Sequence, residues 1–196
     1  MNNKKLIAIA GGIGSGKSVV SSILRVIGYS VYDCDSEAKR LMNESCEIKD
    51  DLISNFGEES ILSNGSINTA HISKVVFNNP QALKILNSIV HPRVKDDVLK
   101  KVNECAGNVM FIESAILLQS NLLDIIDGVW LVDAPENVRI ERVIKRNSMS
   151  EADVKRRISA QSGQDYSVLQ SCKTIVNDDK EAILPQVLKL VSEISL

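Results

Sequence analysis

The stretch Gly11-Gly12-Ile13-Gly14-Ser15-Gly16-Lys17-Ser18 decides the fold, because it matches the pattern G-x-x-x-x-G-K-S. It follows the apolar run Leu6–Ala10, typical of a buried strand, and precedes residues 19–27, whose apolar positions have helical spacing. A glycine-rich loop between a strand and a helix is the context in which this pattern binds phosphate. Because both flanking segments fit, we favour a phosphate site over a glycine-rich turn in which the lysine occurs by chance. A dinucleotide-binding G-x-G-x-x-G is excluded, because Lys17 stands where its third glycine would be.

Each residue type in this loop suits the phosphates of a nucleotide. Glycines let backbone N–H groups converge on a phosphate, and the helix N-terminus adds about half a positive charge. Lys17 is predicted to reach the β- and γ-phosphates, and the Ser18 hydroxyl is predicted to bind Mg²⁺. The predicted nucleotide-binding residues of the loop are Gly12, Ile13, Gly14, Ser15, Gly16, Lys17 and Ser18.

Composition and charge are those of an ordinary globular chain. The 196 residues suffice for one domain with a full core, and only 4% are aromatic, so aliphatic side chains must fill that core. A net charge of −2 gives no general attraction to nucleic acid or to an anionic membrane. Four scattered cysteines and two histidines argue against a disulfide framework or a structural zinc site. No apolar stretch approaches the roughly 20 residues of a membrane span, and the first apolar run is predicted to be a strand, not a signal peptide. We therefore expect a cytoplasmic protein with no nucleic-acid or membrane partner, whose oligomeric state stays open.

Short apolar runs alternate with helical patterns along the chain. This alternation, without polar positions inside the runs, predicts an α/β fold with a five-stranded parallel sheet between two helical layers. The expected strands are Leu6–Ala10, Ser30–Tyr32, Val109–Ile112, Val129–Val132 and Thr174–Val176.

The long interval between the second and third strands predicts a helical insertion. The expected helices are Asp35–Asn43, Glu47–Phe56, Thr69–Phe77, Pro80–Ile89 and Pro92–Ala106, since Pro80 and Pro92 each fit a first helical turn. We expect a single domain, 1–196, with three parts. These are a core at about 1–34, 107–138 and 172–196, an insertion at about 35–106 and a lid at about 139–171.

A basic window at 139–157 supplies the predicted lid. Alone, it would be a solvated pair of helices, but beside a phosphate loop its cations can close over the charge of a transferring phosphoryl group. Arg142 and Arg146 lie four residues apart and so share a helix face. Ser150 with Asp153 predicts the start of the second lid helix.

The elements of a guanine-specific switch, N-K-x-D and D-x-x-G, are absent from the chain, so a small-molecule kinase is favoured. Asp33 closes the second strand, at the sheet edge where ligands of parallel sheets bind, and is the candidate base or aligner for an acceptor hydroxyl. Asp35 either faces the substrate or caps a helix.

Glu113 ends the third strand and is the candidate for holding Mg²⁺ or its water. Asp133 ends the fourth strand but is more typical of a turn. His91-Pro92-Arg93 is predicted to open a helix whose N-terminus favours anions.

Together these motifs resemble the dephospho-coenzyme A kinase family over nearly the whole chain. The family pattern is matched by the loop, the acidic Asp33-Cys34-Asp35, the pair His91-Pro92 with Arg93, the lid residues Arg142, Arg146 and Arg157-Ile158-Ser159-Ala160-Gln161, and the final Asn177. One element departs from it: where the family shows D-x-P-L-L-x-E, this chain has Glu113-Ser114-Ala115-Ile116-Leu117-Leu118-Gln119. Glu113 keeps its charge, whereas Gln119 cannot supply one.

The resemblance implies phosphorylation of the ribose 3′-hydroxyl of dephospho-coenzyme A by ATP with Mg²⁺, the last step of coenzyme A synthesis. It implies catalytic roles for Lys17, Asp33, Arg142 and Arg146, and a place near the adenine for Asn177. It implies acceptor binding by Asp33, Asp35, His91 and Arg93, and a metal site at Ser18 and Glu113. The alternatives are another nucleoside or nucleotide kinase, such as a nucleoside monophosphate kinase, and a non-catalytic nucleotide-binding regulator.

Overall fold

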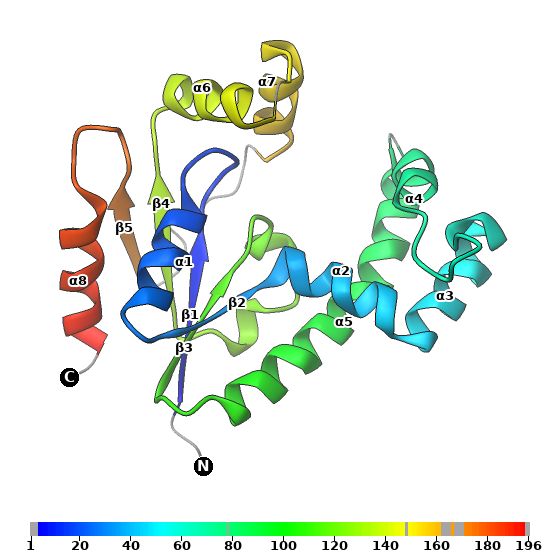
Figure 1. The fold of residues 1–196 in the computed structure, drawn as a ribbon, viewed down its shortest axis with the longest axis horizontal. Helices are drawn as coiled ribbons and strands as arrows, with labels where there is room; N and C mark the ends of the chain where they lie inside the picture. Colours follow the sequence, from blue (N-terminus) through cyan, green and yellow to red (C-terminus); the bar gives the residue numbers. More distant parts are fainter. Residues whose placement is uncertain (1–3, 78, 148, 162–165, 167–170, 195–196) are drawn as a thin grey trace. The chain divides into compact units, whose positions relative to one another are not determined.

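The structure is a computed structural model that describes residues 4–77, 79–147, 149–161, 166 and 171–194 (Figure 1). Within them lies an all-parallel five-stranded sheet in the order β2-β3-β1-β4-β5. The strands are β1 (Lys5–Ala10), β2 (Ser30–Asp33), β3 (Val109–Glu113), β4 (Gly128–Asp133) and β5 (Cys172–Val176). The predicted fold class is confirmed, and each strand extends beyond its predicted range by one or two residues.

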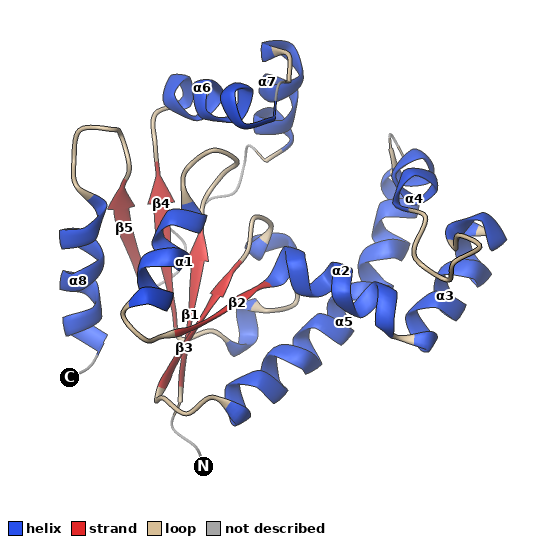
Figure 2. Cartoon of the chain, viewed as in Figure 1, coloured by secondary structure: helices blue, strands red, loops and turns tan. Residues whose placement is uncertain are grey.

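Helices lie between the strands in the chain (Figure 2). They are α1 (Lys17–Val26), α2 (Cys34–Glu44), α3 (Cys46–Phe56), α4 (Thr69–Val76), α5 (Pro80–Glu104), α6 (Glu136–Asn147), α7 (Glu151–Ala160) and α8 (Ile183–Ile194), with short 3₁₀ turns at Glu58–Ser60, Leu117–Gln119 and Leu123–Ile125. The chain divides into two compact units, each described by itself below. The sheet unit takes the chain up to Asp33 and again from Val102, and the helical unit is Cys34–Lys101.

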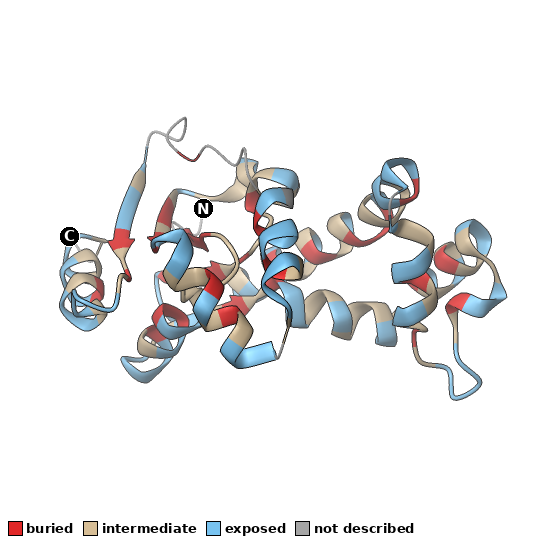
Figure 3. Cartoon of the chain, turned by 90° about the horizontal axis from the view of Figure 1, so that it is seen from above, coloured by how far each residue is buried: buried red, intermediate tan, exposed pale blue. Residues whose placement is uncertain are grey.

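One face of the sheet packs against α1 and α8. Ile9 of β1 and Phe111 of β3 are fully buried against Leu24 of α1 and Val187 of α8. The ring of Trp130 lies 4.9 Å from that of Phe111, centre to centre. Residues that point to the opposite face, such as Ala8 and Ile112, are also fully buried, which explains why the strands are continuous apolar runs. Figure 3 shows the burial by colour, and the edge strand β5 is largely exposed.

The helical unit corrects one prediction. Instead of separate helices at Pro80–Ile89 and Pro92–Ala106, a single 25-residue helix, α5, runs through Pro92. An interior proline removes one backbone hydrogen bond and normally breaks a helix. Here the buried residues Val90, Val94 and Val98 form one stripe across the proline, so packing of a shared face overrides the local break. His91 and Arg93 therefore lie in mid-helix, and the prediction that His91-Pro92-Arg93 opens a helix is wrong.

Candidate active site

The glycine loop turns sharply between β1 and α1. Gly11 and Gly16 have φ angles of +144° and +98°, values that side-chain-bearing residues rarely adopt. A Cβ at Gly11 would lie 2.3 Å from the carbonyl oxygen of Val132 in β4, and one at Gly16 would lie 2.0 Å from Nδ2 of Asn177. A backbone oxygen at Gly11 and a side-chain nitrogen at Gly16 therefore occupy the space that a side chain would need, and the loop can bring its N–H groups around a small anion.

Positive charge collects at this loop. The Lys17 ammonium donates hydrogen bonds to the carbonyl oxygens of Gly11 at 2.9 Å and Gly12 at 3.4 Å, so it lies across the loop. Lys17 is also the first residue of α1, whose N-terminus carries the positive end of the helix dipole. The loop thus fits a phosphate chain, which would supply acceptors to both the ammonium and the amides.

Asp33 and Glu113 stand side by side at the carboxyl edge of the sheet. The strand register pairs Asp33 with Glu113, and Glu113 with Ile9 of β1, two residues before the loop. Side chains alternate along a strand, so Glu113 points to the same face as Phe111, the face that packs against α1. Both carboxylates therefore lie on the side of the sheet where Lys17 and Ser18 begin α1.

Asp133 ends β4, on the other side of β1 from β3, and points to the opposite face of the sheet. Trp130 and Val132 belong to the core beneath α1, so the alternation points Asp133 away from it. Its side chain is exposed, and its backbone oxygen accepts a hydrogen bond from Asn177 N at 2.8 Å. This geometry favours Glu113 over Asp133 as the carboxylate near Ser18.

Asn177 and Arg142 contact the loop from two further elements. The buried Asn177, just after β5, donates from Nδ2 to the Ser15 carbonyl at 2.6 Å. Arg142 of α6 donates to Asn177 Oδ1 at 2.9 Å, to Asp179 Oδ1 at 2.5 Å and to the Gly14 carbonyl at 3.4 Å. One guanidinium therefore links the lid, the loop and the segment after the last strand.

The structure places the second predicted lid arginine differently. Arg146 is exposed and donates to Asn147 Oδ1 at 2.9 Å, beside it in the chain. The predicted start of α7 is confirmed, because Ser150 caps it and accepts from Asp153 N.

Sequence reasoning missed two lid residues that contact the loop. Arg139 Nε donates to the Ile13 carbonyl at 2.9 Å, and Gln161 Oε1 accepts from Ile13 N at 2.8 Å. The signal for Arg139 was its place one turn before Arg142, and the signal for Gln161 was the R-I-x-x-Q motif.

The other predicted acceptor-side residues belong to the helical unit. His91 is partly buried in α5, and this burial lowers the pKa of its imidazole. Arg93 pairs with Asp51 of α3 at 3.0 Å and also donates to the Ile89 carbonyl at 3.3 Å. Asp35 is the second residue of α2 and is exposed, so it lies inside the first turn and not at the cap position.

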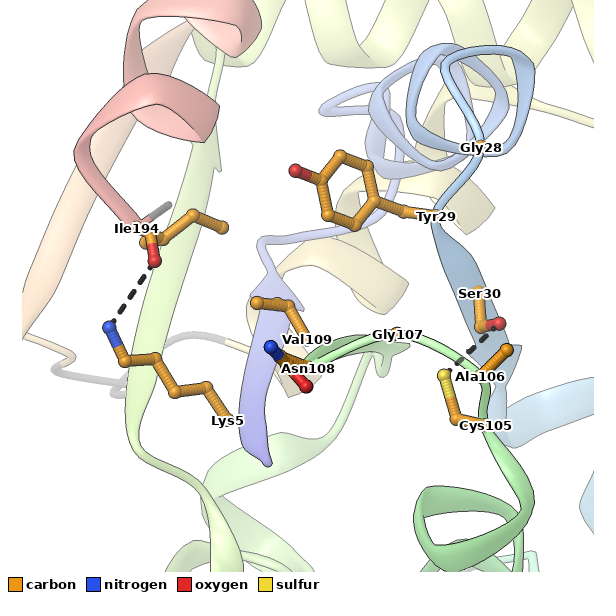
Figure 4. Close-up of a pocket in the computed structure, with 10 residues that line it drawn as sticks. All are labelled: Lys5, Gly28, Tyr29, Ser30, Cys105, Ala106, Gly107, Asn108, Val109 and Ile194. Atoms are coloured by element: carbon orange, nitrogen blue, oxygen red, sulfur yellow. Dashed lines mark hydrogen bonds between the residues drawn. The ribbon is translucent and has the colours of Figure 1, made fainter. Parts of the chain in front are cut away.

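A cavity of about 460 Å³ lies at the amino ends of β1 and β3, the edge of the sheet away from the loop (Figure 4). Lys5, Tyr29, Cys105 and Ile194 are among its lining residues, and none of the predicted site residues is. Lys5 Nζ donates to the Ile194 carbonyl at 3.3 Å. The cavity therefore lies at the opposite end of the strands from the candidate active site.

A parallel sheet in the order 2-3-1-4-5, a glycine-lysine loop after its central strand and an arginine-bearing helix on that loop define a P-loop kinase. Residues 5–182 match the sequence pattern of the CoaE family, described as dephospho-CoA kinase. A dephospho-CoA kinase of Porphyromonas gingivalis is 35% identical over 189 residues, which cover 96% of this chain and 93% of that one. The chain therefore belongs to the dephospho-CoA kinase family, and a kinase family implies ATP as the phosphoryl donor and, here, dephospho-CoA as the acceptor.

Solved structures agree with this fold. A crystal structure from Thermus thermophilus has a TM-score of 0.85 and 29% identity, covering 97% of each chain. A dephospho-CoA kinase from Campylobacter jejuni has a TM-score of 0.69 over 100% of this chain and 98% of its own, and at 21% identity it supports the fold alone. Across the described residues, no helix has the length and apolar character needed to cross a bilayer.

Proposed function

We propose that this chain transfers the γ-phosphoryl group of ATP to the ribose 3′-hydroxyl of dephospho-CoA, in the cytoplasm and with Mg²⁺. The observation that supports this most directly is the row formed by Asp33 and Glu113. It sets two carboxylates on the face of the sheet where Lys17 and Ser18 start α1. The proposed groups for the acceptor hydroxyl (Asp33), the metal (Glu113) and the donor phosphates (Lys17) would thus lie at the same edge of the sheet.

The donor phosphates would be bound by the loop amides and Lys17. Lys17 now donates to loop carbonyls, and a phosphate oxygen is a stronger, charged acceptor for the same ammonium. The ammonium would then offset negative charge on the β- and γ-oxygens as the bond to the leaving group breaks.

The described residues fit a Mg²⁺ ion that keeps most of its waters. The Ser18 hydroxyl and the Glu113 carboxylate are oxygen donors, the kind of ligand that Mg²⁺ takes, and Mg²⁺ is commonly bound through one or two protein groups, phosphates and water. Ser18 would hold it directly, and Glu113 would hold it directly or through a water. The ion would supply charge stabilisation for the transferring phosphoryl group.

Asp33 would accept or align the proton of the acceptor hydroxyl. It lies beyond the phosphate loop in the sheet order, one strand outside Glu113, and it directly precedes the helical unit in the chain. We assign acceptor binding to that unit, with Asp35, His91 and Arg93 as the candidate contacts.

Arg142 and Arg146 would act on phosphate from the lid, and Asn177 would lie near the adenine. Support for Arg142 and Asn177 comes from their contacts with the loop carbonyls of Gly14 and Ser15. Arg146 is supported only by its place one turn after Arg142 in α6.

The test is release of ADP in the presence of ATP, Mg²⁺ and one acceptor at a time. We expect release with dephospho-CoA and none above background with nucleoside monophosphates. The position of the new phosphate is then read by ³¹P NMR, with the 3′-monoester expected. Release with a nucleoside monophosphate alone would support the other kinase class. ATP binding with no release for any acceptor would support a regulator.

A further inference from the structure

Asp179, three residues after the end of β5, has a left-handed backbone with φ at +64°. Among the residues that the structure describes, it is the one residue other than glycine with a positive φ. Residues with side chains rarely adopt this region, although aspartate tolerates it better than most. Its carboxylate Oδ1 accepts a hydrogen bond from Nη2 of Arg142 at 2.5 Å. The residue with the unfavourable backbone is therefore also the one that contacts the lid arginine.

The backbone on both sides of Asp179 is fixed by side chains. The amide of Gln186 in α8 accepts from Val176 N and donates to Val176 O, each at 2.9 Å. The Asp178 carboxylate accepts from the N–H groups of the two residues that follow Asp179, both at 3.0 Å. Such a side-chain turn holds the backbone of the residue that it encloses. The surroundings therefore maintain the left-handed conformation of Asp179.

Stability alone does not account for the pair of Asp179 with Arg142. The Asp179 side chain is 67% exposed, and an ion pair in such contact with water adds little to stability. A left-handed aspartate also carries a conformational cost that glycine would avoid. An unfavourable backbone that its surroundings maintain is typical of functional sites. The pair is therefore better explained by its effect on Arg142.

The guanidinium of Arg142 is fixed through its Nη2 atom, which donates to Asn177 Oδ1 at 2.9 Å and to Asp179 Oδ1. These two contacts use both hydrogens of that nitrogen, so the planar head group has two points of attachment on one side. Its Nη1 atom then lies at the loop, 3.4 Å from the Gly14 carbonyl oxygen. Without the Asp179 carboxylate, the head group could turn about its contact with Asn177.

We propose that Asp179 is a positioning residue that sets the orientation of the Arg142 guanidinium at the phosphate loop. This rests on the proposed role of Arg142 as a cation for the transferring phosphoryl group. A cation that is already oriented needs no reorganisation when charge develops on that group. Asp179 would thus act on the rate of phosphoryl transfer through Arg142, without contacting either substrate.

Two substitutions separate this role from a purely structural one. Asp179→Gly suits the left-handed backbone and removes the carboxylate. Its thermal midpoint should stay the same or rise, while kcat falls about fivefold, the worth of one net hydrogen bond. Asp179→Asn keeps an oxygen acceptor without its charge, so kcat should fall only about twofold. Glu181→Gln removes the same charge from an exposed side chain two residues further on, and as the matched control it should keep kcat.

The experiment measures kcat and both KM values, and repeats the Asp179→Gly comparison in an Arg142→Ala background by single-turnover transfer of ³²P from ATP to dephospho-CoA. The fivefold loss should appear in kcat, with KM for dephospho-CoA unchanged, and should disappear when Arg142 is absent.

Three results would overturn the inference and leave the proposed function standing. They are an unchanged kcat in Asp179→Gly, a loss of the same size without Arg142, and a lower thermal midpoint in Asp179→Gly. The first two would mean that Asp179 does not act through Arg142, and the third that its role is structural. No phosphorylation of dephospho-CoA by the unaltered chain would overturn the proposed function and the inference with it.

Discussion

The sheet unit and the helical unit obey local sequence rules to different degrees. In the sheet unit every strand begins and ends within two residues of its apolar run, and the glycines stand where the backbone needs them. In the helical unit, α5 continues through Pro92 against the strongest local signal for a helix end. A strand that is buried on both faces must be apolar at every position, so its sequence marks its ends. A helix that is buried along one stripe can continue through an unfavourable residue when the buried stripe continues on both sides of it.

This difference suggests that chemistry depends on single residues in the sheet unit, and that stability in the helical unit depends on shared faces. The largest expected effect is therefore at Lys17. Replacing it with alanine should lower kcat for dephospho-CoA phosphorylation by about 10³ or more, because its ammonium offsets charge on the transferring group. Far-UV circular dichroism should show an intact fold. Near-normal turnover in a folded variant would remove the loop from the site.

Asp33 comes next in expected size. Asp33→Asn keeps the shape of the side chain and removes the charge, so kcat should fall by about 10² to 10⁴, the usual range for a general base. The affinity for ATP should change little, as measured by calorimetry. Asp133→Asn, at the end of a strand in the same sheet but on the opposite face, is the matched control and should keep near-normal kcat. Equal losses in both variants would mean that strand-end acids act on stability alone.

A smaller effect is expected for the metal at Glu113. Loss of an outer carboxylate typically costs about 10- to 100-fold in metal affinity, so Glu113→Gln should raise the Mg²⁺ concentration for half-maximal rate by about tenfold. Glu113→Asp should stay active, because it keeps the charge. Gln119→Glu should also be tolerated, since Gln119 is exposed at the end of a 3₁₀ turn. A Mg²⁺ titration that is the same for Glu113→Gln and the unaltered chain would move the metal role to Asp33.

The smallest effect tests the helical unit. Pro92→Ala should raise the free energy of unfolding by about 1–2 kcal/mol, because an interior proline costs about 3 kcal/mol relative to alanine and part of this is offset by a freer unfolded chain. Urea unfolding measures it, and Pro80→Ala, at the first position of the same helix, should be close to neutral. Destabilisation by Pro92→Ala would show that the proline itself contributes to packing. It would contradict the inference that the buried stripe alone carries α5 through this position.

The sequence predicted those parts of the site that have a local pattern. The loop, the strand-end acids and the Ser150 cap each depend on residues within a few positions of one another. Arg139 and Gln161 could not be assigned in this way, because their partner Ile13 is 126 and 148 residues distant in the chain. Asp35 was ambiguous because aspartate is favoured both at a helix cap and in the first turn, and Asp35 lies two positions after the cap position. The continuation of α5 through Pro92 could not be predicted, because it depends on a buried stripe whose packing partners are not visible in the local sequence.

The cavity at the amino ends of β1 and β3 offers a place for a spectroscopic label. Cys105 lines it and is partly accessible, with Sγ 3.4 Å from the hydroxyl oxygen of Ser30. β1 spans six residues, about 16 Å from end to end at the usual rise per residue, which separates this thiol from the glycine loop. A thiol-reactive fluorophore at Cys105, in a chain whose exposed Cys46 and partly exposed Cys172 are changed to serine, would follow unfolding of the sheet at a distance from the glycine loop.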